Sequence, residues 1–226
     1  MKVLNLINQS EKFDYYTGDI HGQIEEFVHS ITHVINISDA NIFILGDIGL
    51  GFYKKNYYIS IFDKINKKLI DKNINLILFR GNHDDPSYFV DNIFLNRSNI
   101  FIVEDYTIVK TATHSTLCVG GARSIDKCDR WKIDKKTKKL VRDGWWQDER
   151  VKNIPLNFDE FINEHYVDVI CTHCAPINVE YSFSDIPETF LEKDEKMIDE
   201  IKEDCTILCN IWEKFAAAYD KEFEEV

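Results

Sequence analysis

Two side chains that can bind a metal ion lie two residues apart early in the chain, in Thr17-Gly18-Asp19-Ile20-His21-Gly22. They follow an aromatic run, Phe13 to Tyr16, that predicts a buried strand. At a strand end, residues i and i+2 point to the same side, so the Asp19 carboxylate and the His21 imidazole can bind one ion together. The flanking glycines allow the backbone to bend tightly on both sides. Most Asp-x-His pairs lie in surface loops. This pair becomes a candidate metal site because three similar segments, each with polar residues after a strand, follow downstream.

Each of these three segments follows an apolar run that predicts a buried strand. The polar segments are Gly46-Asp47, Asn82-His83-Asp84 and Thr172-His173. In layered α/β sheets the ligand crevice lies at the carboxyl ends of the strands, so all four polar segments should converge on one rim. Carboxylate, imidazole and amide oxygen together suit manganese, iron or zinc better than magnesium or calcium. Asp47 lies centrally in this series and is the natural bridge between two ions.

The spacing of apolar residues predicts the elements that position these side chains. Strands over Phe13–Thr17, 42–45 and 76–79 alternate with helices over about 23–35 and 57–70, which indicates an α/β layered fold. Short strands over 100–103, 106–110 and 116–119 then predict a second, more antiparallel sheet, and 167–171 is predicted as a further buried strand. Residues 132–142 form a lysine-rich segment that we expect to be a solvated hairpin tip.

The chain is expected to form one domain, residues 1–226, that ends in a long acidic amphipathic helix over about 194–220. Its predicted apolar stripe recurs every three or four residues, which is typical of packing against a core; a partner surface is the alternative. The members of the stripe are Met197, Ile201, Cys205, Leu208, Trp212, Phe215 and Tyr219.

The net charge of -12 and the pI of about 5 argue against a nucleic-acid binder that relies on phosphate contacts. The charge is uneven, because 14 acidic residues and 5 lysines lie from Asp185 onward. No signal peptide and no run long enough to span a bilayer is visible, and six cysteines without secretory signals suggest reduced thiols, so we expect a cytoplasmic protein. Cys171, Cys174, Cys205 and Cys209 could form a zinc site, but burial as small hydrophobic side chains is the favoured alternative.

These segments resemble the motifs of the calcineurin-like metallophosphoesterases. The matching residues are Gly18-Asp19-Ile20-His21-Gly22, Gly46-Asp47-Ile48-Gly49, Gly81-Asn82-His83-Asp84 and Thr172-His173, and the resemblance covers about 13–176. It implies a four-layer α/β/β/α sandwich with a dinuclear metal site. By this resemblance Asp19, His21 and Asp47 would bind the first ion, and Asp47, Asn82 and His173 the second.

The resemblance also implies roles for residues that bind no metal. His83 would protonate the leaving alkoxide or stabilise the phosphoryl transition state, and Asp84 would orient its ring. Asn82 is in addition a candidate for contacting the substrate.

Two further segments, 120–126 and 145–149, resemble a bacterial and phage branch of the family. In the first, Arg123 could bind a substrate phosphate or could equally pair with a nearby acid. In the second, Trp145 and Trp146 are expected to form the packed base of a lid rather than a platform for stacking bases.

The sequence departs from the family where a closing Gly-His-x-His motif is expected, because the last histidine is His173. Two ligands would therefore be missing and the sandwich could be incomplete at its C-terminal side. The chain could be truncated, naturally short, or a non-catalytic relative that keeps the fold as an interaction surface.

The resemblance implies hydrolysis of phosphomonoesters or phosphodiesters by a metal-bound hydroxide at a dinuclear site. The cofactors would be two divalent ions, manganese first, with iron, zinc or nickel as alternatives. A non-catalytic binding module that uses the acidic helix is the alternative, and a nuclease is a third reading that only the basic segment 132–142 supports. The substrate, the native metals and the oligomeric state are left open.

Overall fold

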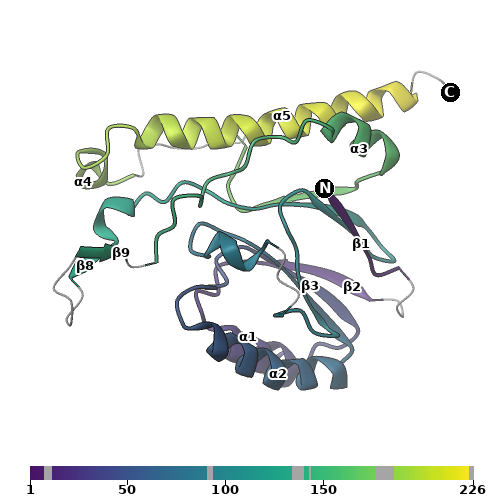
Figure 1. Cartoon of the computed structure of the whole chain (residues 1–226). Coiled ribbons are helices and arrows are strands. Elements are labelled where there is room, and N and C mark those ends of the chain that lie inside the picture. The colour runs from purple at the N-terminus through teal and green to yellow at the C-terminus, as the bar shows by residue number, and fades with distance from the viewer. Residues whose placement is uncertain (8–11, 91–93, 134–139, 143, 177–185, 224–226) are drawn as a thin grey trace.

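A computed structural model describes residues 1–7, 12–90, 94–133, 140–142, 144–176 and 186–223 (Figure 1). Two four-stranded sheets face each other, and helices cover the outer face of each (Figure 1). The strands are β1 Lys2–Asn5, β2 Phe13–Thr17, β3 Ala40–Leu45, β4 Ile74–Phe79, β5 Ile100–Ile102, β6 Thr107–Lys110, β7 Ser115–Val119, β8 Trp131–Ile133, β9 Leu140–Arg142 and β10 Val169–Thr172. The helices are α1 Ile24–His29, α2 Lys55–Asp71, α3 Phe158–Glu164, α4 Glu188–Leu191 and α5 Met197–Phe223, with short helices η1 Ser30–Val34, η2 Pro86–Tyr88 and η3 Lys127–Asp129.

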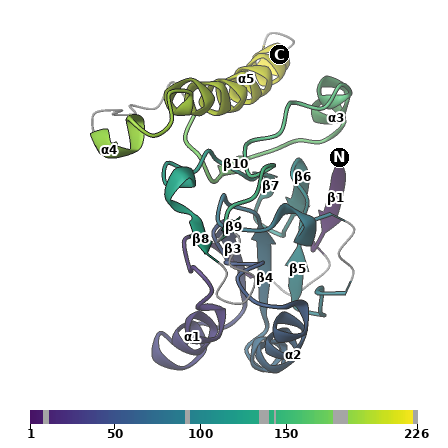
Figure 2. The ribbon, with the colours of Figure 1, turned by 60° about the vertical axis from the view of Figure 1, so that its left-hand side comes forward.

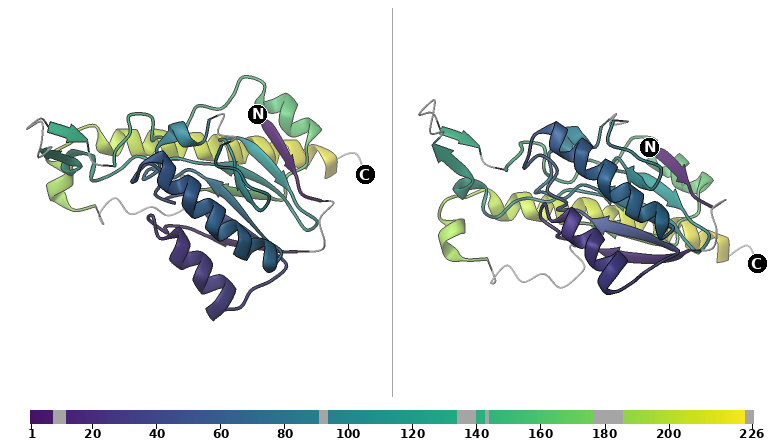
Figure 3. Two further views of the ribbon diagram at one scale, coloured as in Figure 1. Left: turned by 60° about the horizontal axis from the view of Figure 1, so that its bottom comes forward. Right: turned by 90° about the horizontal axis from the view of Figure 1, so that it is seen from below.

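The first sheet has the order β2-β3-β4-β5, and all its strands are parallel. Its central strands, β3 and β4, are almost wholly apolar because they are covered on both faces. Helices α1 and α2 lie side by side across the outer face (Figure 3). Their apolar side chains pack on the sheet around Val28, Phe62 and Leu69.

The second sheet has the order β1-β6-β7-β10. Strands β6 and β7 form an antiparallel hairpin, whereas β1 pairs with β6 and β10 with β7 in parallel. Helices α3 and α5 cover its outer face (Figure 2). Phe43 and Phe79 of the first sheet pack against Val109 and Cys118 of the second, which closes the space between the sheets. The four layers predicted from the sequence are therefore confirmed.

Two strand predictions need correction. The strand at 100–103 was assigned by its pattern to the second sheet, but β5 pairs with β4 of the first sheet. The reason is local, because two hydrogen bonds bring the chain back beside β4: the Leu76 amide donates to the Asn99 backbone carbonyl, and the Asn99 side-chain Nδ2 donates to the Ile74 carbonyl. The second sheet is also more parallel than expected, because β1, which the pattern does not reveal, occupies one of its edges.

The first predicted strand, β2, is an edge strand rather than a buried one. Its outer side is open to solvent, and Phe13 is 70% exposed. Its inner side is used by the sandwich, since Tyr16 stacks on Phe43 and bonds the Thr116 hydroxyl. The aromatic run therefore predicts the position of the strand correctly, but the prediction that this strand is buried is wrong.

Helix α5 is present where the sequence predicts a helix, and its stripe packs in two clusters. Leu208, Phe215 and Tyr219 pack with the second sheet, whereas Met197, Ile201 and Cys205 pack around Ile186. Trp212 is the exception, because it is 53% exposed while its neighbour Ile211 is buried. In the basic segment β8 pairs with β9 in an antiparallel manner, and residues 134–139 between these strands lie outside the described residues, so the predicted hairpin tip stays a prediction. No helix in the described part of the chain is long and apolar enough to cross a bilayer.

The loops that follow the strands of the first sheet are joined by one buried carboxylate, that of Asp84. It accepts hydrogen bonds from the backbone amides of Ile48 (3.1 Å), Gly49 (2.7 Å) and Leu50 (2.8 Å) in the loop after β3. It also accepts one from Gly81 (2.8 Å) directly after β4. Burial raises the pKa of this carboxyl to about 6, while the amide hydrogen bonds favour the ionised form. The carboxylate thus fixes two loops against each other.

Replacing Asp84 with Asn tests this role. The amide nitrogen cannot accept hydrogen bonds, so two of the four buried backbone amides lose their partner. We expect the free energy of unfolding of the metal-free protein to fall by about 2 to 5 kcal/mol, measured by urea denaturation.

Asp85→Asn is the matched control, because Asp85 caps the short helix η2 through the Ser87 amide and Asn is an equally good cap. Equal losses in the two variants would contradict the special role of Asp84.

Candidate metal centre

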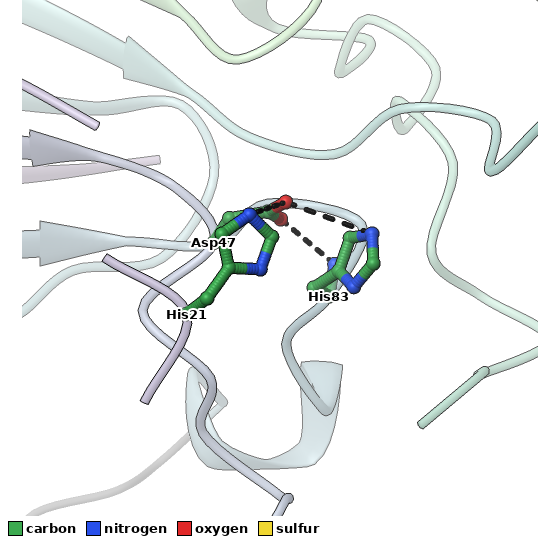
Figure 4. Close-up of side chains that lie close together, drawn as sticks. All are labelled: His21, Asp47 and His83. Atoms are coloured by element: carbon green, nitrogen blue, oxygen red, sulfur yellow. Dashed lines mark hydrogen bonds and ion pairs between the residues drawn. The ribbon is translucent and has the colours of Figure 1, made fainter. Parts of the chain in front are cut away.

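The centre of the site is the Asp47 carboxylate, which is buried in the loop after β3. Its Oδ2 lies 3.7 Å from His21 Nε2 and 3.8 Å from His83 Nε2 (Figure 4). The rings of His21 and His83 meet edge to face with centroids 4.9 Å apart. Two imidazoles from different loops therefore face the same carboxylate oxygen.

The other oxygen of Asp47 faces a different pair of side chains. Asp47 Oδ1 lies 3.3 Å from His173 Nε2, which is also 2.9 Å from Asn82 Oδ1. Asp19, Asp47 and His173 each place a ligand atom within 4.8 Å of the others, as do His21, Asp47 and His83. Asp47 is the member common to both groups, which is the arrangement a bridging ligand requires.

The backbone at three of these residues is in the left-handed region. The φ angles are 57° at Asp19, 41° at His21 and 52° at Asp47, although none is glycine. Such conformations cost free energy and gather at functional sites, where the surrounding structure maintains them. Here hydrogen bonds between the two loops do so, from Asp19 N to Gly46 O and from His21 N to Asp47 O.

Close approach of the loops leaves no room for a side chain at Gly81. A Cβ there would lie 2.1 Å from Asp47 Oδ1, and one at Gly46 would lie 2.5 Å from His173 Nδ1. The glycines of these motifs therefore bring the ligands within reach of one another.

Asn82 is oriented by residues from two other segments. Its Nδ2 donates to Ser124 Oγ (2.8 Å), which donates in turn to Glu149 Oε2 (2.7 Å). The Ser124 amide also donates to Glu149 Oε1 (2.9 Å). This chain of hydrogen bonds turns the Asn82 carbonyl oxygen toward His173, as a ligand requires.

The electrostatics of the site favour a cation beside His173. Its Nδ1 lies 2.7 Å from the Leu45 carbonyl, so three acceptor oxygens, from Leu45, Asp47 and Asn82, surround one ring. Burial by itself lowers the pKa of His173, but the hydrogen bond and charge of Asp47 outweigh it and raise the pKa. The pKa of Asp47 is lowered, because His173 and His83 outweigh its burial. With a neutral His173 protonated at Nδ1, the free Nε2 lone pair and the two oxygens form a donor set that fits a divalent ion.

His83 does not interact with Asp84, and the prediction that Asp84 orients this ring is wrong. Asp84 is fully buried with its oxygens on backbone amides, whereas the His83 ring is partly exposed. The ring instead contacts Arg130, whose Nη2 lies at His83 Nε2. Burial lowers the pKa of His83, Asp47 opposes this effect, and Arg130 adds to it.

Arg123 pairs with acids, which is one of the two alternatives that the sequence leaves open. Its buried guanidinium contacts Asp194 and Glu200 and lies 3.7 Å from Glu149 Oε1. These contacts join the segment after β7 to the start of α5 and give no support to a role in binding a phosphate.

The remaining predicted residues are also placed. Trp145 and Trp146 are half-buried; Lys127 lies over the Trp145 ring, and Trp146 packs at Gly51. Cys174 and Cys205 approach within 3.8 Å of each other. In the described part of the chain, the potential metal-binding groups of three or more residues contain only Asp and His, so the cysteine alternative gains no support.

Sequence reasoning missed Ser124 and Glu149 as orienting residues and missed Arg130 entirely. The signal for the first two lay in the quoted segments, but their pairing joins positions 25 apart. Arg130 carried no signal, because a single arginine beside a lysine-rich segment looks like a solvated side chain.

A family model for calcineurin-like phosphoesterases matches residues 15–195. No curated protein and no solved structure matches the chain. The match spans well over half of the sequence and includes every residue of the site around Asp47. Both the sandwich and the ligand-bearing loops agree with it, and the chain belongs to the calcineurin-like phosphoesterase family.

Proposed function

We propose that this protein is a metal-dependent phosphoesterase that hydrolyses phosphomonoesters or phosphodiesters at a site built around Asp47. The observation that carries the proposal is the position of one buried carboxylate between two sets of ligands, with His21 on one oxygen and His173 on the other. Family membership supports metal-dependent phosphoester hydrolysis as the class of reaction.

The proposed ligands are Asp19, His21 and Asp47 for one ion, and Asp47, Asn82 and His173 for the other. The closest ligand atoms group somewhat differently, with Asp19 near His173, so the division between two ions is itself part of the proposal. Mixed nitrogen and oxygen donors favour manganese, with iron, zinc or nickel as alternatives. When bound, such ions polarise phosphoryl oxygens and lower the pKa of the water that attacks phosphorus.

The residues of the chain contribute position and proton transfer. Asp47, whose pKa is lowered, stays ionised and offers an oxygen to each side. Ser124 and Glu149 hold the Asn82 carbonyl in place. His83 presents Nε2 beside Asp47, where the ring can donate a proton to the leaving oxygen or a hydrogen bond to the phosphoryl group.

The charge of the protein is compatible with an anionic substrate. Bound divalent ions would be the largest local charges, so a net charge of -12 does not exclude a phosphate ester. All six cysteines lie in the described residues and none of them forms a disulfide, which supports a reducing compartment such as the cytoplasm.

Asp47→Asn should lower manganese-stimulated hydrolysis by more than about 100-fold, because even orienting residues around metal ligands typically contribute 10- to 100-fold. The measurement is the rate of p-nitrophenol release from p-nitrophenyl phosphate, a monoester, and from bis(p-nitrophenyl) phosphate, a diester. Wild-type activity on one ester only would identify the preferred class.

Asp63→Asn is the matched control, since Asp63 is an exposed residue of α2 that pairs with Arg97. Its rate should equal that of the wild type. Hydrolysis by Asp47→Asn at the wild-type rate would contradict the proposal. A wild-type protein that binds metal but cleaves neither ester would favour the non-catalytic alternative.

Metal binding can be measured without catalysis. Manganese at about 100 times its dissociation constant should stabilise the protein by about 2.7 kcal/mol, which raises Tm by about 5 to 10 °C for a chain of this size. Differential scanning calorimetry with and without EDTA measures the shift. The Asp47→Asn substitution should abolish most of this rise in Tm. A wild-type Tm that does not change with manganese, iron, zinc or nickel would contradict the metal site.

A further inference from the structure

Arg130 is a cation that reaches His83, beside Asp47, from outside the ligand-bearing loops. It follows the short helix η3 and precedes β8, so it lies far along the chain from the motifs that form the site. Its side chain is only 8% exposed, and its Nη2 contacts Nε2 of His83. A buried guanidinium beside an imidazole needs a reason other than solubility.

Two neighbours fix the direction of this guanidinium. Arg130 Nε donates to Asp126 Oδ1 over 2.8 Å, and Nη1 donates to the Gly144 carbonyl. These contacts use Nε and Nη1, two of the three guanidinium nitrogens, and so fix the plane of the group. The third nitrogen, Nη2, is therefore directed at His83 by these contacts rather than by attraction to the ring.

The direction matters because His83 Nε2 faces the centre of the site. The same nitrogen lies 3.8 Å from Asp47 Oδ2, the oxygen that also faces His21. A group that enters between His83 and Asp47 would therefore meet Arg130 Nη2 as well. The guanidinium shape and its permanent charge match a phosphoryl oxygen better than they match a neutral imidazole.

Arg123 offers a contrast within the same protein. Its guanidinium contacts Asp194 and Glu200 and lies 3.7 Å from Glu149 Oε1, so three carboxylates offset its single charge. Among the residues that the structure describes, the one carboxylate that pairs with Arg130 is Asp126. Of the two arginines, Arg130 has the positive charge that fewer carboxylates offset, and its Nη2 points toward the site where an anionic ligand would bind.

We propose that Arg130 contacts the phosphoryl group of the substrate, and that Asp126 and Gly144 position it for this contact. The inference rests on the proposed function, because it assigns a substrate contact at the same site. In the ligand-free protein Nη2 donates to the Nε2 lone pair of neutral His83. A phosphoryl oxygen that enters the site takes over this hydrogen bond, and Nε2 is then free to take up a proton from water and to donate it to the leaving oxygen.

The test is the binding of inorganic phosphate to the manganese-loaded protein, followed by isothermal titration calorimetry. Arg130→Lys should weaken phosphate binding by about 10- to 100-fold, because a hydrogen bond to a charged group is lost while the net charge is kept. The dissociation constant for manganese should stay unchanged. Arg97→Lys, the same substitution at an arginine that pairs with Asp63 on the surface of α2, is the matched control.

A second variant covers the case in which a change at Arg130 prevents folding. Asp126→Asn keeps the arginine but removes the charge of its anchor, so it should weaken phosphate binding less than Arg130→Lys does. In steady-state hydrolysis, both variants should raise KM for the substrate that the wild type cleaves.

The outcomes separate this inference from the proposed function. Wild-type dissociation constants for phosphate in Arg130→Lys and Asp126→Asn overturn the inference, even if the protein hydrolyses esters. Phosphate binding that depends on Arg130 in a protein without hydrolysis supports the inference and overturns the catalytic proposal. A wild-type protein that binds manganese but not phosphate overturns the assigned contact.

Discussion

The buried Asp84 carboxylate is the constraint on which the rest of the site depends. Its four amide donors belong to the loops after β3 and β4, which carry Asp47 and Asn82. Neither loop has regular structure, so the strands alone would not fix their relative position. A charge taken from water is costly, and only several hydrogen bonds together can offset that cost.

From this anchor the interactions extend outward in two directions. Toward the second sheet, Asp47 reaches His173 at the end of β10, so the site closes across both halves of the sandwich. Toward the segment after β7, Asn82 reaches Ser124 and Glu149. The Arg80 side chain reinforces this side, because it is buried at the end of β4 and donates to the carbonyls of Glu149 and Arg150. Each ligand is thus held by elements that are distant in the chain.

Local sequence was sufficient for much of this structure. Strands β3 and β4 are uninterrupted apolar runs that end in glycine and polar residues, and the topology brings such ends together. It was not sufficient for β5, whose sheet depends on the return of the chain at Asn99, nor for β1, a short strand with no distinctive pattern. Asp84 shows a further limit: the family resemblance implied that it orients His83, but only the fold reveals that its two oxygens accept hydrogen bonds from four backbone amides. Arg130 depends on contacts 47 residues away, which no periodicity encodes.

The tight glycine contacts of the loops have a consequence for anyone who wishes to redesign this protein. At Gly46 and Gly81 a single added carbon would collide with a ligand atom, so the metal-facing side of the site offers almost no room for sequence change. The opposite side is built from Asp126, Arg130 and Gly144, which flank the small hairpin of β8 and β9. New substrate preferences should therefore be sought by mutagenesis of that side, while the residues of the loops that contain Gly46 and Gly81 are left unchanged.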